Sequence, residues 1–360
     1  MEKEIIKFIC GLVLVAIVPV ILIRQLRKEA VFSGTIENQR NVLYAISITS
    51  ISVVSAINQN SEILMGTLIG CAIFQILGIC GVNKLNMVGK QKEGLFVNKS
   101  QYLIFCVILL LFLSADYLLR GKSAENILNQ IDGGILIFLF GIYLYFTYGK
   151  GDALRIWLHD MQPYFSKKSF KAENRKGIGE TKNILKKKKL GIRIIVYILL
   201  TVLIVAGNWL LFDGASKLGV ELKISQYCIG LTLITWSNNL LGILLEYLEE
   251  EAEEENNEES EEDSLEIEFK DGEALIEEAV EEKQNNLEHI VDGIIFSMTL
   301  VLGSIAIGKP IMIHIHMIYD LIIFGIISIL FQFVSKIDSR LAGSGMATIY
   351  IGFIVYAFIR

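Results

Sequence analysis

Few side chains that could act as acids, bases or ligands lie inside the apolar segments of this chain. Asp292 is a carboxylate within an apolar run, where ionisable groups are costly and commonly functional. Because it lies only a few residues into that run, a carboxylate at a helix start near a membrane surface fits it equally well. His314 and His316 are two residues apart and do not share a helical face, which argues against a metal site.

Cysteine usage gives no sign of a metal centre or a disulfide framework. All five cysteines lie inside apolar stretches without the spacing of metal ligands, so they are predicted to be free thiols packed between helices. The sequence also has no nucleophile–base constellation, phosphate-binding loop or metal motif. It therefore predicts neither an enzyme nor a bound cofactor. The cysteines are Cys10, Cys71, Cys80, Cys106 and Cys228.

The apolar residues come in runs of membrane-spanning length. Hydrophobic residues make up 53% of the chain, and a helix needs about 18 or more apolar residues to cross the hydrocarbon of a bilayer. Lipid offers the backbone no hydrogen-bond partner, so each span must be helical. The predicted fold is an all-α polytopic membrane protein with about ten transmembrane helices. The spans are expected at about 5–24, 41–58, 62–83, 101–119, 131–149, 193–212, 224–248, 287–307, 311–334 and 341–359.

Basic residues divide the loops into two sets and so predict an orientation. Lysine and arginine gather after the first, third and fifth spans, whereas the opposite loops carry only scattered charges such as Arg120 and Lys309. Positively charged loops remain cytoplasmic, so both termini are expected outside the cell in a multi-pass plasma-membrane protein. The first span leads into Arg24 and Arg27 rather than a small-residue cleavage site, which predicts a retained helix and not a signal peptide.

Five spans lie on each side of a basic central loop, and the two halves resemble each other weakly. An odd number of spans per half makes the second half enter the membrane from the other side, as in the inverted repeats of secondary transporters. The predicted domains are a first repeat of five spans at 1–149, a basic cytoplasmic loop at 150–192, and a second repeat of five spans at 193–360 with an acidic loop at 249–283.

Each of the two charged loops has two interpretations. The basic loop fits either a role in topology and contact with anionic headgroups, or a regulatory docking site. The acidic loop is too highly charged to bury itself and is predicted to be disordered and solvated. It is either a solvated spacer or a low-affinity collector of cations at a pore mouth.

Several motifs resemble those of the sodium/calcium exchanger (calcium:cation antiporter) superfamily. Residues 66–81 resemble the family's GNxIGSNIFNxxxVLG helix, and 288–303 form a weaker second copy in which an Ile-Phe pair and a later glycine recur. Residues 229–234, with the sequence IGLTLI, resemble the segment that leads into the family's GTSLPE motif. The starts of the last spans, 131–136 and 339–343, also resemble family motifs. The resemblance covers nearly the whole chain.

This resemblance implies ten helices in two inverted five-helix repeats. It further implies that the second and third helices of each half meet at the membrane midplane and bind sodium and calcium in alternation. The family places one glutamate per half in GTSLPE, but these positions are Ile51 and Gly242 in this chain. The family's liganding serine becomes Cys71 in the first copy and Gly293 in the second.

Neutral polar residues at the implied cavity, together with Asp292, are the candidate ligands. Neutral oxygens compensate a buried ion far less than carboxylates do, so high-affinity calcium binding is not expected unless another acid, such as Glu246, enters the cavity. Serine and threonine within spans also commonly bond to their own helix or join helices, and that interpretation stays open. The expected ion-binding residues are Ser47, Thr49, Ser50, Thr67, Gln75, Asn238, Asn239, Asp292 and Ser297.

The sequence thus predicts a cation antiporter that works by alternating access. Its expected partners are the lipid bilayer and inorganic cations (sodium, calcium or protons), with no nucleic acid. A neutral site favours a monovalent cation or a proton. The alternative is a diverged, non-transporting exchanger that acts as a membrane regulatory or interaction protein through its charged loops.

Overall fold

Long helices make up most of the described residues, which also contain a short two-stranded sheet. The computed structural model describes residues 1–28, 36–82, 96–114, 126–148, 179–245, 247, 290–334 and 340–359. Within these ranges eight helices are long and apolar enough to cross a membrane, and two shorter apolar helices occur at Asn41–Ile57 and Leu103–Leu113. Together they correspond in position to the ten predicted spans, which confirms an all-helical, polytopic membrane protein.

Helices of the first half begin and end close to the predicted spans. The first and third spans each contain a π-helical segment, written η. The elements are α1 (Glu2–Leu12), η1 (Val13–Ile17), α2 (Val18–Lys28), α3 (Ile36–Ile57), α4 (Ser61–Ile73), η2 (Phe74–Ile79), α6 (Phe96–Leu113) and α8 (Gln130–Tyr148).

The second half has the same kind of elements. Its seventh span (Gln226–Leu245) contains α11 and η4 followed by helical residues 235–245, and its eighth span (Ile290–Gly308) contains η5 and α14. Helix α10 begins within the basic stretch expected at 150–192. The elements are α10 (Gly179–Leu222), α11 (Gln226–Ile229), η4 (Gly230–Ile234), η5 (Phe296–Val301), α14 (Leu302–Gly308), α15 (Ile315–Val334) and α16 (Arg340–Ile359).

Helices α3, α6 and α10 begin earlier than the predicted spans. Two further boundaries differ for identifiable physical reasons. The ninth span is expected from residue 311, but Ile311 and Met312 form strand β2, which pairs antiparallel with β1 (Ile127–Leu128), and α15 begins only at Ile315. The sixth span is expected to end near residue 212, but α10 continues to Leu222. Its charged last turns remain helical because they pair with α1.

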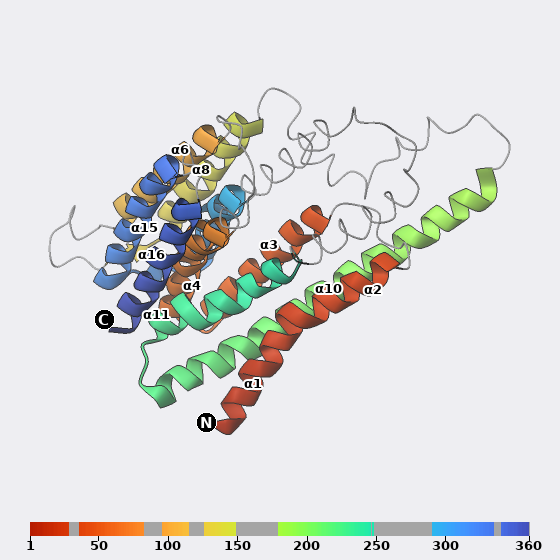
Figure 1. Cartoon of the computed structure of the whole chain (residues 1–360), viewed down its shortest axis with the longest axis horizontal. Helices are drawn as coiled ribbons and strands as arrows, with labels where there is room; N and C mark the ends of the chain where they lie inside the picture. The colour runs from red at the N-terminus through yellow and green to blue at the C-terminus, as the bar shows by residue number, and fades with distance from the viewer. Residues whose placement is uncertain are drawn as a thin grey trace.

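Helices α1 and α10 form a close antiparallel pair beside the remaining helices (Figure 1). A Cβ atom on Gly11 would lie only 2.8 Å from the carbonyl oxygen of Gly207, so glycine allows the two backbones to approach. At one end of the pair, Lys7 Nζ donates to Asp213 Oδ2 at 2.7 Å, and Lys217 Nζ lies 2.6 Å from Asp213 Oδ1. Small residues and paired charges therefore hold α1 against α10.

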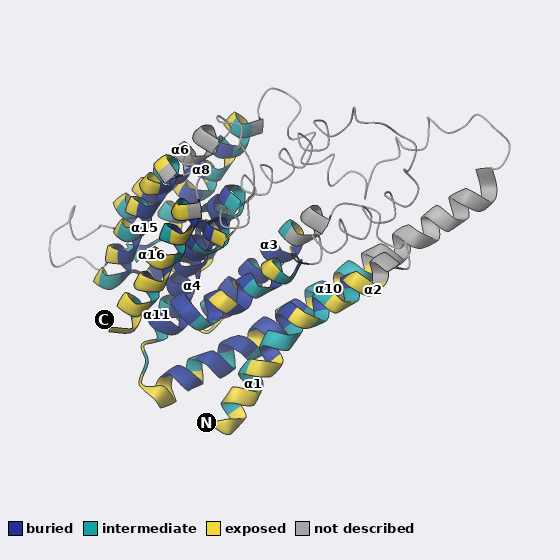
Figure 2. Cartoon of the chain, viewed as in Figure 1, coloured by how far each residue is buried: buried dark blue, intermediate teal, exposed yellow. Residues whose placement is uncertain are grey.

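The third span is the centre of the remaining helices. Every residue from Ile63 to Leu77 is buried, and α4 lies inside the group of helices in Figure 2. A Cβ on Gly66 would lie 2.4 Å from the carbonyl oxygen of Tyr227, and one on Gly230 would lie 2.6 Å from that of Ile63. These glycines set the close contact between the third and seventh spans.

Corresponding features recur in the two halves. Segments η2 and η5 lie in the third and eighth spans, and each is followed two residues later by a buried glycine, Gly81 or Gly303. A Cβ on Gly81 would lie 3.3 Å from the carbonyl oxygen of Gly343, and one on Gly303 would lie 2.8 Å from that of Gly133. The third span thus packs on the tenth as the eighth packs on the fifth, as two repeats of one fold require.

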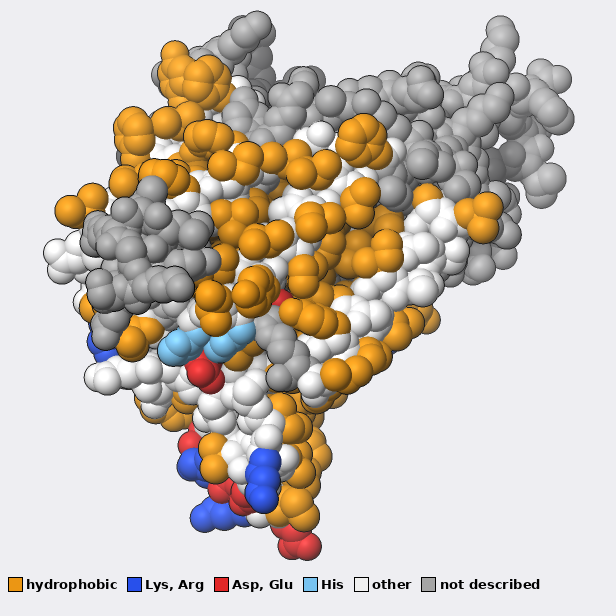
Figure 3. Space-filling view, turned by 90° about the vertical axis from the view of Figure 1, so that its left-hand side faces the viewer, with side chains coloured by type: hydrophobic (Ala, Val, Ile, Leu, Met, Phe, Trp, Pro, Cys, Tyr) orange, Lys and Arg blue, Asp and Glu red, His pale blue; other side chains and the backbone are white. Residues whose placement is uncertain are grey.

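The outer surface is apolar over most of its height. Large side chains such as Phe138, Ile195 and Phe333 are exposed. Figure 3 shows hydrophobic side chains spread over one face, with Lys, Asp and Glu gathered at its lower end. An apolar surface this extensive is unusual in water and is the expected boundary with lipid.

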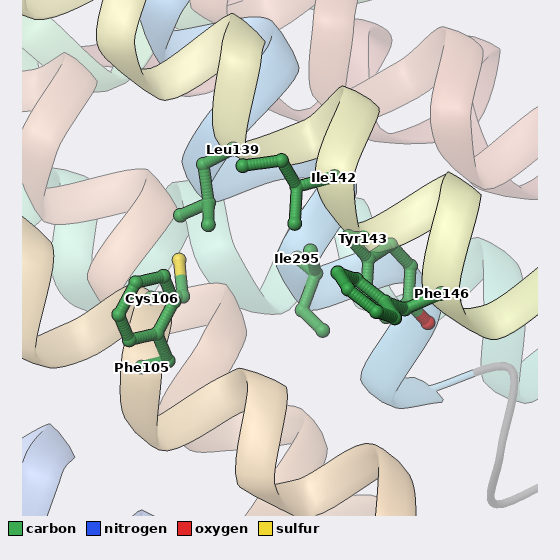
Figure 4. Close-up of a pocket in the computed structure, with 7 residues that line it drawn as sticks. All are labelled: Phe105, Cys106, Leu139, Ile142, Tyr143, Phe146 and Ile295. Carbon is green, nitrogen blue, oxygen red and sulfur yellow. The ribbon is translucent and has the colours of Figure 1, made fainter.

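A cavity of about 240 Å³ lies between α6 and α8 (Figure 4). Phe105 and Cys106 of α6, Leu139 and Tyr143 of α8, and Ile295 of the eighth span contribute to its walls. Its lining is almost entirely apolar, and it contains none of the predicted ion-binding residues. It is therefore not the candidate ion site.

Replacing Gly66 with alanine is expected to destabilise the protein. The added Cβ would overlap the backbone oxygen of Tyr227, and overpacking of this kind costs about 1–3 kcal/mol. Gly141→Ala is the control, because a Cβ there meets no atom within 4 Å. The apparent melting temperature of each variant in detergent checks this; an unchanged value for Gly66→Ala would contradict the packing described.

Candidate functional site

A first polar network joins α3, α10 and the seventh span. Ser47 Oγ donates to Asn238 Oδ1 at 2.6 Å, which brings together two of the predicted residues. Asn208 Nδ2, from α10, donates to Ser50 Oγ at 2.6 Å and to the carbonyl oxygen of Ser47 at 3.1 Å. All four side chains are buried. We call Ser47, Ser50, Asn208 and Asn238 the serine–asparagine network.

Asn208 belongs to this network but is absent from the ion-binding residues expected from the sequence. The candidate ligands were sought on the second and third helices of each half, where the resemblance implies the ion site, and Asn208 lies on the sixth span. A signal was present, because Asn208 is a strong hydrogen-bonding residue within the otherwise apolar run 195–212.

A second polar network joins the third and seventh spans with α3. Asn239 Nδ2 donates to the carbonyl oxygen of Thr235 at 2.8 Å and to Cys71 Sγ at 3.4 Å. The Tyr44 hydroxyl lies close to the side chains of Cys71 and Gln75. Because Thr67, Cys71 and Gln75 recur at every fourth residue, they lie along one helical face toward the seventh span. We call Tyr44, Thr67, Cys71, Gln75, Thr235 and Asn239 the cysteine network.

Four buried oxygens at these networks accept no hydrogen bond within the described residues. They belong to side chains that are 0–5% exposed. A buried acceptor without a partner costs free energy, so such groups usually indicate a bound water or ion. The oxygens are Thr67 Oγ1, Gln75 Oε1, Asn208 Oδ1 and Asn239 Oδ1.

The π-helical segments lie at or beside these polar residues. Gln75 is in η2, Ser297 is in η5, and Thr235 directly follows η4. Thr235 Oγ1 donates to the carbonyl oxygen of Gly230 at 2.9 Å, five residues earlier. A π turn disturbs the regular helical bonding and is frequent at functional sites, which agrees with a site at this level.

The remaining predicted residues lie in other surroundings. Ser297 is buried, and its hydroxyl donates to the carbonyl oxygen of Ile294 on its own helix at 2.9 Å. Thr49 is half-buried on α3. Asp292 accepts a hydrogen bond from the hydroxyl of Tyr143 on α8, at the helix interface beside the apolar cavity. Asp292 thus has a structural partner outside both polar networks.

The two positions expected to hold glutamate differ in their surroundings. Ile51 is fully buried in the hydrophobic core, whereas a Cβ on Gly242 would meet no atom within 4 Å. The described residues contain no group of three or more His, Cys, Asp and Glu side chains suited to a metal ion. Glu246 and the acidic loop 249–283 lie outside the described residues.

Comparisons with known proteins agree with this geometry. The family profile "Sodium/calcium exchanger protein" matches residues 49–149, which include the third span. The matched segment is less than a third of the 360 residues, and this part of the chain is similar to that family. No curated protein sequence matches it.

Solved structures of the sodium-calcium exchanger NCX_Mj have the same fold. One was soaked with 2.5 mM Na⁺ and 0.1 mM Ca²⁺, and another with 10 mM Na⁺ and zero Ca²⁺. Each is 17% identical to this chain, covers 98% of both chains and has a TM-score of 0.52. At this level of identity the likeness shows a shared all-helical, multi-pass fold.

Asn208→Ala is expected to destabilise the protein. The change removes the two hydrogen bonds that Asn208 Nδ2 donates to Ser50 Oγ and the Ser47 carbonyl oxygen, and each buried hydrogen bond contributes about 0.5–1.5 kcal/mol. Asn58→Ala is the matched control, because Asn58 is exposed and bonds only within α3. Thermal unfolding in detergent should separate the two; equal melting temperatures would count against the serine–asparagine network.

Proposed function

We propose that this protein is an antiporter of monovalent cations, with sodium as its first candidate, and that it binds the ion with neutral oxygens. One observation carries the proposal: four buried, unpartnered oxygens lie on the third, sixth and seventh spans. No carboxylate belongs to either polar network as described. Amide and hydroxyl oxygens can replace part of the hydration shell of a monovalent cation, as carbonyl oxygens do in potassium channels.

Charge decides between monovalent and divalent ions. The cost of removing an ion from water rises with the square of its charge, so a divalent ion costs about four times as much as a monovalent ion of equal size. Calcium sites in proteins meet this cost with six to eight oxygens and several carboxylates. Neutral oxygens without a carboxylate favour a monovalent cation.

The proposed roles follow from the contacts. Gln75 and Asn239 supply carbonyl oxygens, and Thr67 supplies a hydroxyl oxygen. Asn208 supplies a further carbonyl oxygen from α10, while Ser47, Ser50 and Asn238 position its amide. We assign Asp292 to the support of the helix interface with Tyr143 rather than to direct binding. Ser297 and Thr49 remain candidate ligands in a conformation with a rearranged site.

Transport would follow alternating access between the two inverted halves. The predicted orientation, with both termini outside and the basic loop in the cytoplasm of a plasma-membrane protein, is part of this proposal. One contact supports the prediction that the segments before the fifth and ninth spans lie on the same side of the membrane. Strands β1 and β2 pair, and they precede the fifth and ninth spans, which are both expected to enter from outside.

Sodium flux tests the proposal directly. Proteoliposomes with the wild-type protein should take up ²²Na⁺ against an opposing cation gradient, and Asn239→Ala should abolish the uptake because it removes an oxygen ligand. Ser304→Ala, on the exposed side of α14, should transport normally, as should deletion of 249–263. Absence of flux for every cation and gradient tried would favour the non-transporting alternative.

Introducing a carboxylate where the family has its glutamates should shift the preference of the site from monovalent to divalent cations. Gly242→Glu should raise ⁴⁵Ca²⁺ binding, because a carboxylate adds the charge that a divalent ion requires and open space is present beside Gly242. Gly242→Gln is the isosteric control without the charge. Ile51→Glu should bind calcium also, but with lower stability, because Ile51 is buried in the core. Equal calcium binding by the Glu and Gln variants would contradict the assignment of position 242.

A further inference from the structure

Tyr44 crosses the space between the third and eighth spans. Its side chain leaves α3, is 9% exposed, and reaches Cys71 and Gln75 of the third span with its hydroxyl. On the other side, a Cβ on Gly293 of the eighth span would lie 3.7 Å from Tyr44 Cε1 and 3.9 Å from Cδ1. The ring of Tyr44 therefore packs against Gly293, where the absence of a side chain leaves room for it.

The two positions that Tyr44 touches correspond to each other in the repeats. Cys71 and Gly293 each precede their π-helical segment, η2 or η5, by three residues. Two equivalent points of an inverted pair face the same central region. A ring that extends from one to the other lies across that region, so Tyr44 fills space between the two halves.

Tyr44 lies beside the residues that carry two of the unpartnered oxygens. Its hydroxyl is close to Gln75 and to Cys71, and Cys71 Sγ accepts from Asn239 Nδ2 at 3.4 Å. A cation that came to Gln75 Oε1 or Asn239 Oδ1 from the side of Gly293 would therefore have to pass the tyrosine ring.

We propose that Tyr44 is the residue that closes the ion site, and that Gly293 is the seat that receives its ring. The ring swings away from Gly293 before a cation reaches Gln75 and Asn239, and its bulk limits the size of the ion and of its remaining hydration shell. This inference rests on the proposed function for its physiological meaning. The closure itself is a property of the fold and can be measured without transport.

Cysteine accessibility provides that measurement. A variant in which Cys71 is the only cysteine is made by replacing Cys10, Cys80, Cys106 and Cys228 with alanine or serine. In proteoliposomes, a water-soluble methanethiosulfonate should label Cys71 slowly while Tyr44 is present. Tyr44→Ala should raise the rate of Cys71 labelling about tenfold or more, because the reagent can then reach the thiol without a prior movement of the buried ring. Tyr44→Phe, which keeps the ring, should stay within about threefold of the parent.

Matched controls separate closure from loosening of the fold. A protein with Cys106 as its only cysteine, on α6 and away from Tyr44, should label at the same rate with and without Tyr44→Ala. Tyr44→Leu provides a second truncated variant if Tyr44→Ala does not fold, and it should label faster than Tyr44→Phe.

The outcomes distinguish the two proposals. Equal Cys71 labelling in the parent, the Tyr44→Phe variant and the truncated variants would overturn the closure, as would Tyr44→Phe labelling as fast as Tyr44→Ala. If labelling follows the expected order but no variant transports any cation, the closure stands and the antiporter assignment fails. If the wild type transports sodium and labelling is insensitive to position 44, the antiporter stands and the closure fails.

Discussion

The structure depends on one constraint: inside lipid, every polar group must find its hydrogen-bond partner within the protein. The backbone meets this requirement as helices. Many serine and threonine hydroxyls meet it by donating to a carbonyl oxygen about one turn earlier, as Ser52, Ser55 and Ser328 do. Against that background, a group of four buried oxygens without a partner at two adjoining networks is an exception. The exception is the physical basis for assigning an ion site there.

Glycine makes this region possible. The third span is buried along most of its length and approaches the seventh span through Gly66 and Gly230, so closely that a Cβ would overlap backbone atoms. Close backbone approach brings short polar side chains such as Cys71 and Thr235 within reach of one another. Larger residues at the glycine positions would separate the helices and leave the same polar groups in contact with apolar neighbours. The close packing at these glycines is therefore what brings the polar side chains of the candidate site together.

Sequence patterns predicted much of the fold because span length and hydropathy are strong signals. They also brought together Ser47 with Asn238, since the repeat alignment placed both within the same motif of their halves. The sequence patterns did not single out Asn208, because the sixth span is otherwise apolar. They did not single out Tyr44 either, because an aromatic residue in a helix is usually part of a core. The start of α15 was also missed, since hydropathy cannot separate an apolar strand such as β2 from an apolar helix. The orientation and the loops at 150–178 and 249–283 remain predictions.

Neighbouring residues on the seventh span serve opposite partners. Asn238 bonds with α3, whereas Asn239 bonds with the third span, since adjacent helical residues point about 100° apart. A rotation of this helix about its axis would therefore break the hydrogen bonds of both asparagines in the same movement. The seventh span therefore couples the two polar networks. A rotation that breaks the hydrogen bond of one network also breaks that of the other, so the two networks would form and break together.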